Sequence, residues 1–426
     1  MAYEVTPEYD LGFVEYSERG NDFSPAQTDM LLEKIKTASQ GEDVALVVFV
    51  HGWKHNASTE DENVKSFKDA LSHIYRSKVA GKKKLIGVYI GWRGMSFHGL
   101  QLENLTFWDR KAAAEEVGRG GVTEFVVRLE AISKSRPGNF MLTAGHSFGS
   151  AIVLSALGDT LMEKMLDLQN HRVGVEAFGD VVVLLNPAVE ANLGLLLKEN
   201  SMKVGHQQRK VPTLMYVVSS RADSPTNTFF PIGQWFGVTL TWNEVVIDRN
   251  YPGQKKTYHI PETELDRITI GNYERFWTGY MDDVMVEGPS KLRYQSVISD
   301  SVISDSGLGV KAIGSTDTIG KWGYKSYCSN TLTFNDNHRL PCYADDPINF
   351  ISAPESFIEN HNDVFNDSVK SLLATAVMES LIRKQQGPED QYCQEGGEFS
   401  FGKCFTYYYE VNRRLSSKVP LVSIAN

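Results

Sequence analysis

The sequence predicts an α/β fold with a mostly parallel central sheet and helices on both faces. Apolar runs of strand length alternate with segments of helical periodicity through the first half of the chain. The runs over 44–50 and 85–90 are almost uninterrupted, which is typical of parallel strands buried on both faces. The 426 residues, 42% of them hydrophobic, are enough for a large core.

The expected elements follow one another along the chain. Ser24, Pro25 and Gln27 form a capping-box pattern that opens a helix running to about Thr37. Strands are then expected over 44–50, 85–90, 140–144, 181–185 and 213–218, and helices over 64–74, 122–132 and about 148–170. Repeated strand–helix–strand units of this kind build a parallel sheet.

The pattern changes after about residue 230. Residues 1–230 are expected to form the first part of the core, and 346–385 its last strand and helix. The range 231–345 is rich in Gly, Asn, Asp and Thr, and it holds a tandem repeat, 296–300 and 301–305. We expect a long insertion here, serving as a lid or a partner surface, and a C-terminal extension over 386–426.

Composition excludes some partners. The net charge of −10 argues against nucleic acid, which needs a basic face. No apolar run reaches the roughly 18 residues that cross a bilayer. Glu4, Glu8 and Asp10 make the N-terminus unlike a secretory signal. The expected location is cytoplasmic, or exported without a cleaved N-terminal signal.

All four cysteines lie in the last quarter of the chain. Their spacing suggests two local pairs, Cys328 with Cys342 and Cys393 with Cys404, and neither pair has the C-x-x-C spacing of a zinc site. Free thiols and disulfides both remain open. Disulfides would indicate an oxidising compartment.

A candidate nucleophile stands at a sharp strand–helix turn. The segment Gly145-His146-Ser147-Phe148-Gly149 matches G-x-S-x-G, with an apolar strand before it and an apolar helix after it. Small residues let strand and helix approach closely, so that the Ser147 hydroxyl projects above the sheet. The alternative is a glycine-rich turn with an incidental serine. The flanking elements favour a nucleophile.

Two backbone N–H groups are candidates for an oxyanion hole, which stabilises the charge of a tetrahedral intermediate. Phe148 supplies one, directly after the serine, and Trp53 the other, in the turn after the strand over 44–50. His51 and His55 are four residues apart, a metal-ligand spacing on a helix, but they follow a strand. We expect a structural hydrogen bond from His51 and no metal.

The serine needs a base and an acid, in the chain order Ser, Asp or Glu, His. Asp223 follows the strand over 213–218, and Glu190 is the alternative acid after the preceding strand. His361 lies between the last apolar strand and the last long helix, where the base belongs. His259 and His338 are interpreted as ordinary loop histidines.

Aromatic and histidine side chains near the same edge of the sheet are candidates for a substrate pocket. They are His51, His146, Trp92 and Trp108. Packing at the rim of the core explains these residues equally well.

Together these residues resemble the α/β-hydrolase superfamily of esterases and lipases over about 40–225 and 345–385. The resemblance rests on the His51-Gly52 loop, the turn from Gly145 to Gly149 and the late His361. The chain is more closely similar to a little-described group of microbial hydrolases in three segments, 49–56, 91–94 and 106–110.

The resemblance implies cleavage of a small-molecule or lipid ester through an acyl-enzyme, with a Ser-His-Asp triad and no cofactor. The alternatives are a lipase or phospholipase acting at membranes, as an exported effector for example, and a non-catalytic member of the fold that only binds. Ester, thioester and amide substrates use the same triad, so the sequence does not choose among them. The oligomeric state also stays open.

Overall fold

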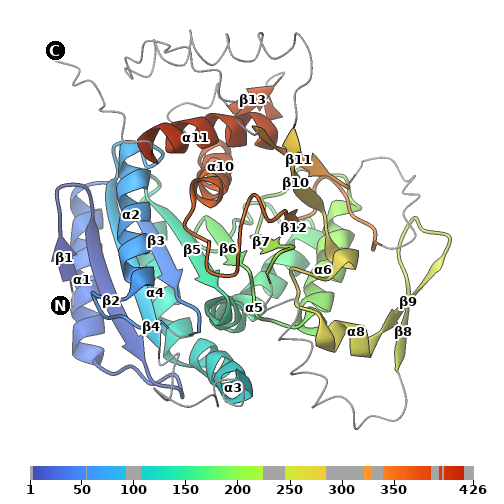
Figure 1. Ribbon diagram of the computed structural model, residues 1–426, viewed down its shortest axis with the longest axis horizontal. Helices are drawn as coiled ribbons and strands as arrows, with labels where there is room; N and C mark the ends of the chain where they lie inside the picture. The colour runs from blue at the N-terminus through green and yellow to red at the C-terminus, as the bar shows by residue number, and fades with distance from the viewer. Residues whose placement is uncertain are drawn as a thin grey trace.

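The centre of the molecule is a ten-stranded sheet with the order β1-β2-β4-β3-β5-β6-β7-β12-β10-β11 (Figure 1). The computed structural model describes residues 3–53, 55–92, 107–223, 245–284, 321–328, 339–384, 393–395 and 398–416. The sheet strands are β1 (Tyr3–Val5), β2 (Asp10–Tyr16), β3 (Val44–Val50), β4 (Lys84–Trp92), β5 (Phe140–His146), β6 (Val181–Leu185), β7 (Met215–Ser220), β10 (Gly279–Val284), β11 (Lys321–Ser326) and β12 (Ile348–Ala353). All neighbours from β2 to β10 in this order are parallel, and only β1 and β11 run antiparallel to theirs. The predicted α/β class is confirmed.

Helices cover both faces of the sheet. Their bounds are α1 (Pro25–Gly41), α2 (Glu62–Arg76), α3 (Phe107–Val117), α4 (Thr123–Lys134), α5 (Phe148–Gln169), α6 (Ala191–Gly205), α8 (Glu262–Arg267), α10 (Asp367–Arg383) and α11 (Phe401–Ser416). One apolar core lies between the sheet and α1, α3, α4, α5 and α6, and a second lies against α2, α10 and α11. Figure 1 shows α10 and α11 on the opposite side of the sheet from α3 and α5. Among the described residues, no helix combines the length and the apolar character that a bilayer crossing requires.

The range expected as an insertion contributes to the sheet. Within it, β10 pairs in parallel with β12, and β11 pairs with β10. A separate hairpin, β8 (Val246–Asn250) with β9 (Thr257–Pro261), precedes α8. These described parts therefore extend the core layer past β12, while the tandem repeat over 296–305 lies outside the described residues.

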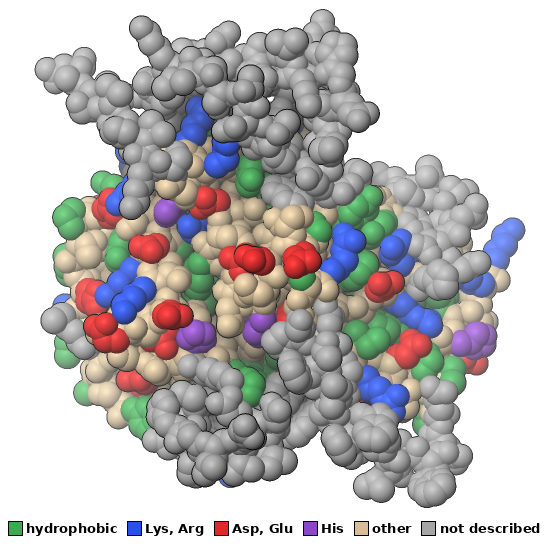
Figure 2. All heavy atoms as spheres, in the orientation of Figure 1, with side chains coloured by type: hydrophobic (Ala, Val, Ile, Leu, Met, Phe, Trp, Pro, Cys, Tyr) green, Lys and Arg blue, Asp and Glu red, His purple; other side chains and the backbone are tan. Residues whose placement is uncertain are grey.

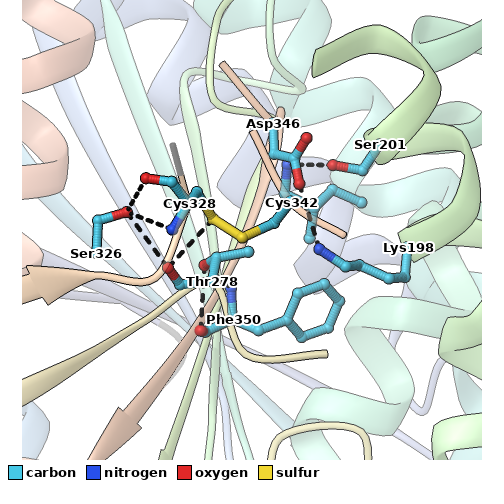
Figure 3. The surroundings of a disulfide bond; sticks show 9 residues. Lys198, Ser201, Thr278, Ser326, Cys328, Cys342, Asp346 and Phe350 are labelled. Carbon is cyan, nitrogen blue, oxygen red and sulfur yellow. Dashed lines mark hydrogen bonds and ion pairs between the residues drawn. A yellow bond between two sulfur atoms is a disulfide. The ribbon is translucent and has the colours of Figure 1, made fainter. Parts of the chain in front are cut away.

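Both cysteine pairs are disulfides, Cys328–Cys342 and Cys393–Cys404. The first links the segment after β11 to the segment before β12 (Figure 3). Beside it, the fully buried Lys198 of α6 pairs with Asp346 at 3.2 Å. Burial raises the pKa of the Asp346 carboxyl to about 6, and Lys198 opposes this shift. The disulfide and the ion pair together tie the start of β12 to its neighbours.

Charged side chains of both signs are interspersed on the face seen in Figure 2.

Candidate active site

The turn between β5 and α5 holds Ser147 in an uncommon backbone conformation, with φ 56° and ψ −121°. Strand and helix meet so closely that side chains at the neighbouring glycines would collide with backbone. A Cβ atom on Gly149 would lie 2.1 Å from the carbonyl oxygen of Val50, and one on Gly145 would lie 2.6 Å from that of Gly149. Both glycines are therefore required by the geometry, which sets Ser147 at the N-terminus of α5.

Ser147, His361 and Asp223 form a continuous hydrogen-bonded series. The Ser147 Oγ and the His361 Nε2 are 2.7 Å apart, and the His361 Nδ1 is 2.8 Å from the Asp223 Oδ1. The Asp223 side chain is fully buried, whereas the His361 side chain remains 15% exposed. Both ring nitrogens of His361 are thus engaged, one by a hydroxyl and the other by a carboxylate.

Three parallel strands bring these residues together from distant parts of the chain. Ser147 follows β5, Asp223 follows β7, and His361 lies in the connection between β12 and α10. β5, β6, β7 and β12 are adjacent in the sheet, so their carboxyl ends share one edge. Residues 147 and 361 meet although 214 positions separate them.

The alternative acid and the other histidines take different places. Glu190 precedes α6, and its backbone forms a bridge with Thr269. Asp223, and not Glu190, is the carboxylate that contacts the Nδ1 of His361. His259 lies on β9 and contacts Asp248 at 2.6 Å. His338 lies outside the described residues.

The two predicted oxyanion donors flank the serine. Phe148 is the first residue of α5, and its backbone directly follows Ser147. The loop that holds Trp53 is close as well, because a Cβ on Gly52 would lie 2.8 Å from the Cβ of Ser147. Both backbone segments therefore border the serine, and a side chain at position 52 would intrude on it.

The side chains of His51 and Trp92 are buried at the ends of β3 and β4. The His51 Nδ1 contacts the Gly52 carbonyl at 2.8 Å, and the Trp92 amide donates to the His51 Nε2 at 3.1 Å. Burial lowers the pKa of His51 to about 4. His55 contacts Asp61 instead, and within the described part of the chain no cluster of three or more His, Cys, Asp or Glu is arranged to hold a metal.

Of the two remaining pocket candidates, His146 and Trp108, only the first has a described side chain. The His146 side chain is also buried, and its Nε2 lies 2.8 Å from the backbone carbonyl oxygen of His361. Burial holds the pKa of His146 well below its usual range, so the ring is neutral. His146 therefore contacts the loop that carries the candidate base. Trp108 lies on α3, and its side chain is outside the described residues.

Asn186 is a residue of the site that was not predicted from the sequence. It directly follows β6 with φ 42°, a left-handed conformation that Asn tolerates better than most residues. Its Nδ2 donates to the His361 carbonyl oxygen at 3.0 Å, and its Oδ1 accepts from the Ser220 amide at 2.9 Å. The only sequence signal was an Asn-Pro pair directly after an apolar strand.

Comparisons with known proteins are sparse. No protein-family model matches the chain, and no curated protein matches it. Among solved structures, it is similar to phospholipase PlaB from Legionella pneumophila in complex with thio-NAD, at 14% identity and a TM-score of 0.26. That similarity covers 51% of this chain and 49% of the other, about half the length of each. These comparisons assign no family, and the chemistry of the site rests on its own geometry.

Proposed function

We propose that this protein is a serine hydrolase that cleaves carboxylic esters through an acyl-enzyme. The observation that supports the proposal is the series Ser147–His361–Asp223, with contacts of 2.7 and 2.8 Å. A serine hydroxyl is a weak nucleophile at neutral pH, and an imidazole in contact with it can remove its proton. A buried carboxylate on the other ring nitrogen selects the required tautomer.

Each residue has a role in the proposed mechanism. The Nε2 of His361 accepts the hydroxyl proton while the Ser147 Oγ attacks the ester carbonyl. The amides of Trp53 and Phe148 bind the oxyanion. The imidazolium, stabilised by Asp223, protonates the leaving alcohol, and the acyl group remains on Ser147. Water, deprotonated by His361, then releases the acid and restores the serine.

The first test is covalent labelling. A fluorophosphonate probe should label wild-type protein, and mass mapping should locate the label on Ser147. Ser147→Ala should lose the label and lower the hydrolysis of p-nitrophenyl esters by about 10³-fold or more. Ser155→Ala, on the same helix α5, is the matched control and should keep both. Hydrolysis that survives Ser147→Ala would contradict the proposal, and a folded wild type without any activity would favour the binding-only alternative.

The two disulfides favour an oxidising compartment, because such bonds rarely persist in the cytosol. We propose on this ground that the enzyme acts after export, which keeps a lipase or phospholipase acting on membranes as the second candidate. In protein isolated from its native source, all four cysteines should resist thiol alkylation until a reductant is added.

Assays on phospholipid vesicles, run in parallel with assays on soluble esters of increasing chain length, distinguish the two substrate classes. Hydrolysis of monomeric short-chain esters without any release of fatty acid from the vesicles would exclude a phospholipase.

A further inference from the structure

The backbone of His361 is held by two side chains from neighbouring strands. Its carbonyl oxygen accepts a hydrogen bond from the His146 Nε2 at 2.8 Å and a second from the Asn186 Nδ2 at 3.0 Å. His146 is the last residue of β5, and Asn186 directly follows β6. Both donors therefore project from the carboxyl edge of the sheet onto one atom of the loop that bears the candidate base.

The same network reaches the end of β7. The Asn186 Oδ1 accepts from the Ser220 amide at 2.9 Å, and the Ser220 Oγ donates to the carbonyl of Ile358 at 2.7 Å. Ser220 also contacts the acid loop, because its Oγ accepts from the Ala222 amide at 3.1 Å. The loops of His361 and Asp223 are thus fastened to the ends of adjacent parallel strands by side chains that lie outside the Ser147–His361–Asp223 series.

We propose that His146 and Asn186 are positioning residues that fix the backbone of His361 and so keep its imidazole on Ser147. This inference rests on the proposed function. The geometry requires the His146 proton on Nε2, since that nitrogen faces a carbonyl. The His146 Nδ1 is buried without a hydrogen-bond partner among the described residues, as expected for the unprotonated nitrogen of a neutral ring. The centroids of the His146 and His361 rings are 4.9 Å apart. A neutral His146 therefore does not repel the positive charge that His361 acquires in the proposed mechanism.

Removing one donor should affect turnover more than substrate binding. His146→Met keeps a side chain of similar size without the donor, and we expect kcat to fall by about 10- to 100-fold with KM within about twofold, because small misplacements of a catalytic group are costly. His146→Gln can place an amide N–H near the former Nε2 and should recover most of kcat. Asn186→Asp keeps the acceptor for Ser220 but loses the donor, and it should resemble His146→Met. The matched control is His206→Met, because His206 follows α6 and contacts Tyr343, remote from this edge.

A spectroscopic measurement separates positioning from general destabilisation. The proton on the His361 Nδ1 faces a buried carboxylate, so it should give a far-downfield proton NMR signal that His361→Gln abolishes. In His146→Met the signal should weaken or exchange faster with water, while His146→Gln and His206→Met retain it. Wild-type activity and an unchanged signal in both His146→Met and Asn186→Asp would overturn the inference. Absence of Ser147-dependent activity in the wild type would instead overturn the proposed function.

Discussion

His51 is a fully buried histidine whose ring and backbone link the ends of two strands beside the candidate site. Its ring stacks on Tyr89 and Trp92, and its two nitrogens contact the Gly52 carbonyl and the Trp92 amide. The Trp92 indole N–H returns a bond to the His51 carbonyl at 2.9 Å. These contacts fasten the end of β3 to the end of β4, and they fix the turn that leads to Trp53.

The buried ring predicts an acid-sensitive contribution to stability. The pKa of His51 is about 4 in the folded chain, against about 6.5 when unfolded, so the unfolded state binds the extra proton between these values. The contribution is therefore complete above pH 6.5 and is lost as the pH falls toward 4. The unfolding free-energy difference between wild type and His51→Gln should shrink by about 2 kcal/mol from pH 7 to pH 5.

Urea denaturation of both proteins at the two pH values measures this change. The pKa of His146 is also lowered by burial, so His146 adds a pH dependence of its own. Both proteins contain His146, so comparing wild type with His51→Gln cancels this contribution. A difference that is constant with pH would mean that His51 can be protonated in the folded state at little cost.

The three residues of the candidate triad could be proposed from the sequence because their order along the chain is informative. Ser147, Asp223 and His361 each follow a strand that the apolar pattern predicts, so their meeting at one edge could be anticipated. Asn186 could not be found in this way, because its partner is a backbone carbonyl 175 positions away. The residue type alone does not predict a contact with a distant backbone carbonyl.

The two glycines of helix α5 differ in whether their positions could accept a side chain. Gly149 abuts the backbone of β3, whereas Gly158, on the same helix, has open space where a Cβ would lie. The helix is buried over most of its first turns, so it cannot shift outward to accommodate an added methyl group. The consequence is a steric requirement confined to the start of α5.

A pair of alanine substitutions tests this requirement. Gly149→Ala should lower the unfolding free energy by about 3 kcal/mol or more, because overpacking against backbone cannot relax through rotamers. Gly158→Ala should raise it by about 0.5–1 kcal/mol, through the better helix propensity of alanine. Thermal or urea unfolding of the two variants gives both values. Equal effects of the two substitutions would show that α5 moves freely relative to β3.

Two predictions of secondary structure were wrong because the sequence pattern was weak or misleading. The capping box at Ser24 was wrong: the Ser24 side chain makes no capping bond, and Gln27 donates to the Phe13 carbonyl instead. The helix still begins at Pro25, because proline suits the first helical turn. α11 was missed, since its polar and glycine-containing surroundings concealed an apolar face that includes Phe405 and Tyr408.

At the scale of the whole molecule, the C-terminal part completes the second core. α11 packs on α10 and buries Cys404, Phe405, Tyr407 and Tyr408 against it. The Cys393–Cys404 disulfide lies within this layer, with both sulfur-bearing residues fully buried. The helix α10 on which α11 packs begins six residues after His361, so this layer adjoins the loop of the candidate base.

Removing that disulfide should therefore be costly to the fold. It closes a loop of 11 residues, and the loss of chain entropy on cross-linking predicts about 3 kcal/mol of stabilisation. Urea unfolding of a Cys393→Ser/Cys404→Ser double variant should show a loss of this size. The matched comparison is Cys328→Ser/Cys342→Ser, which opens a loop of 14 residues next to β11. An unchanged midpoint for the first variant would show that packing alone holds α11.

The 214 positions between Ser147 and His361 have a consequence for how the protein is made. The ribosome synthesises Ser147 well before the imidazole that would activate it, because translation runs from the N-terminus. Under the proposed function, the Ser147 hydroxyl would lack its base while the chain up to His361, 214 positions further on, is synthesised. The proposed triad would therefore be complete only after β12 and the His361 loop have joined the strands that carry Ser147 and Asp223.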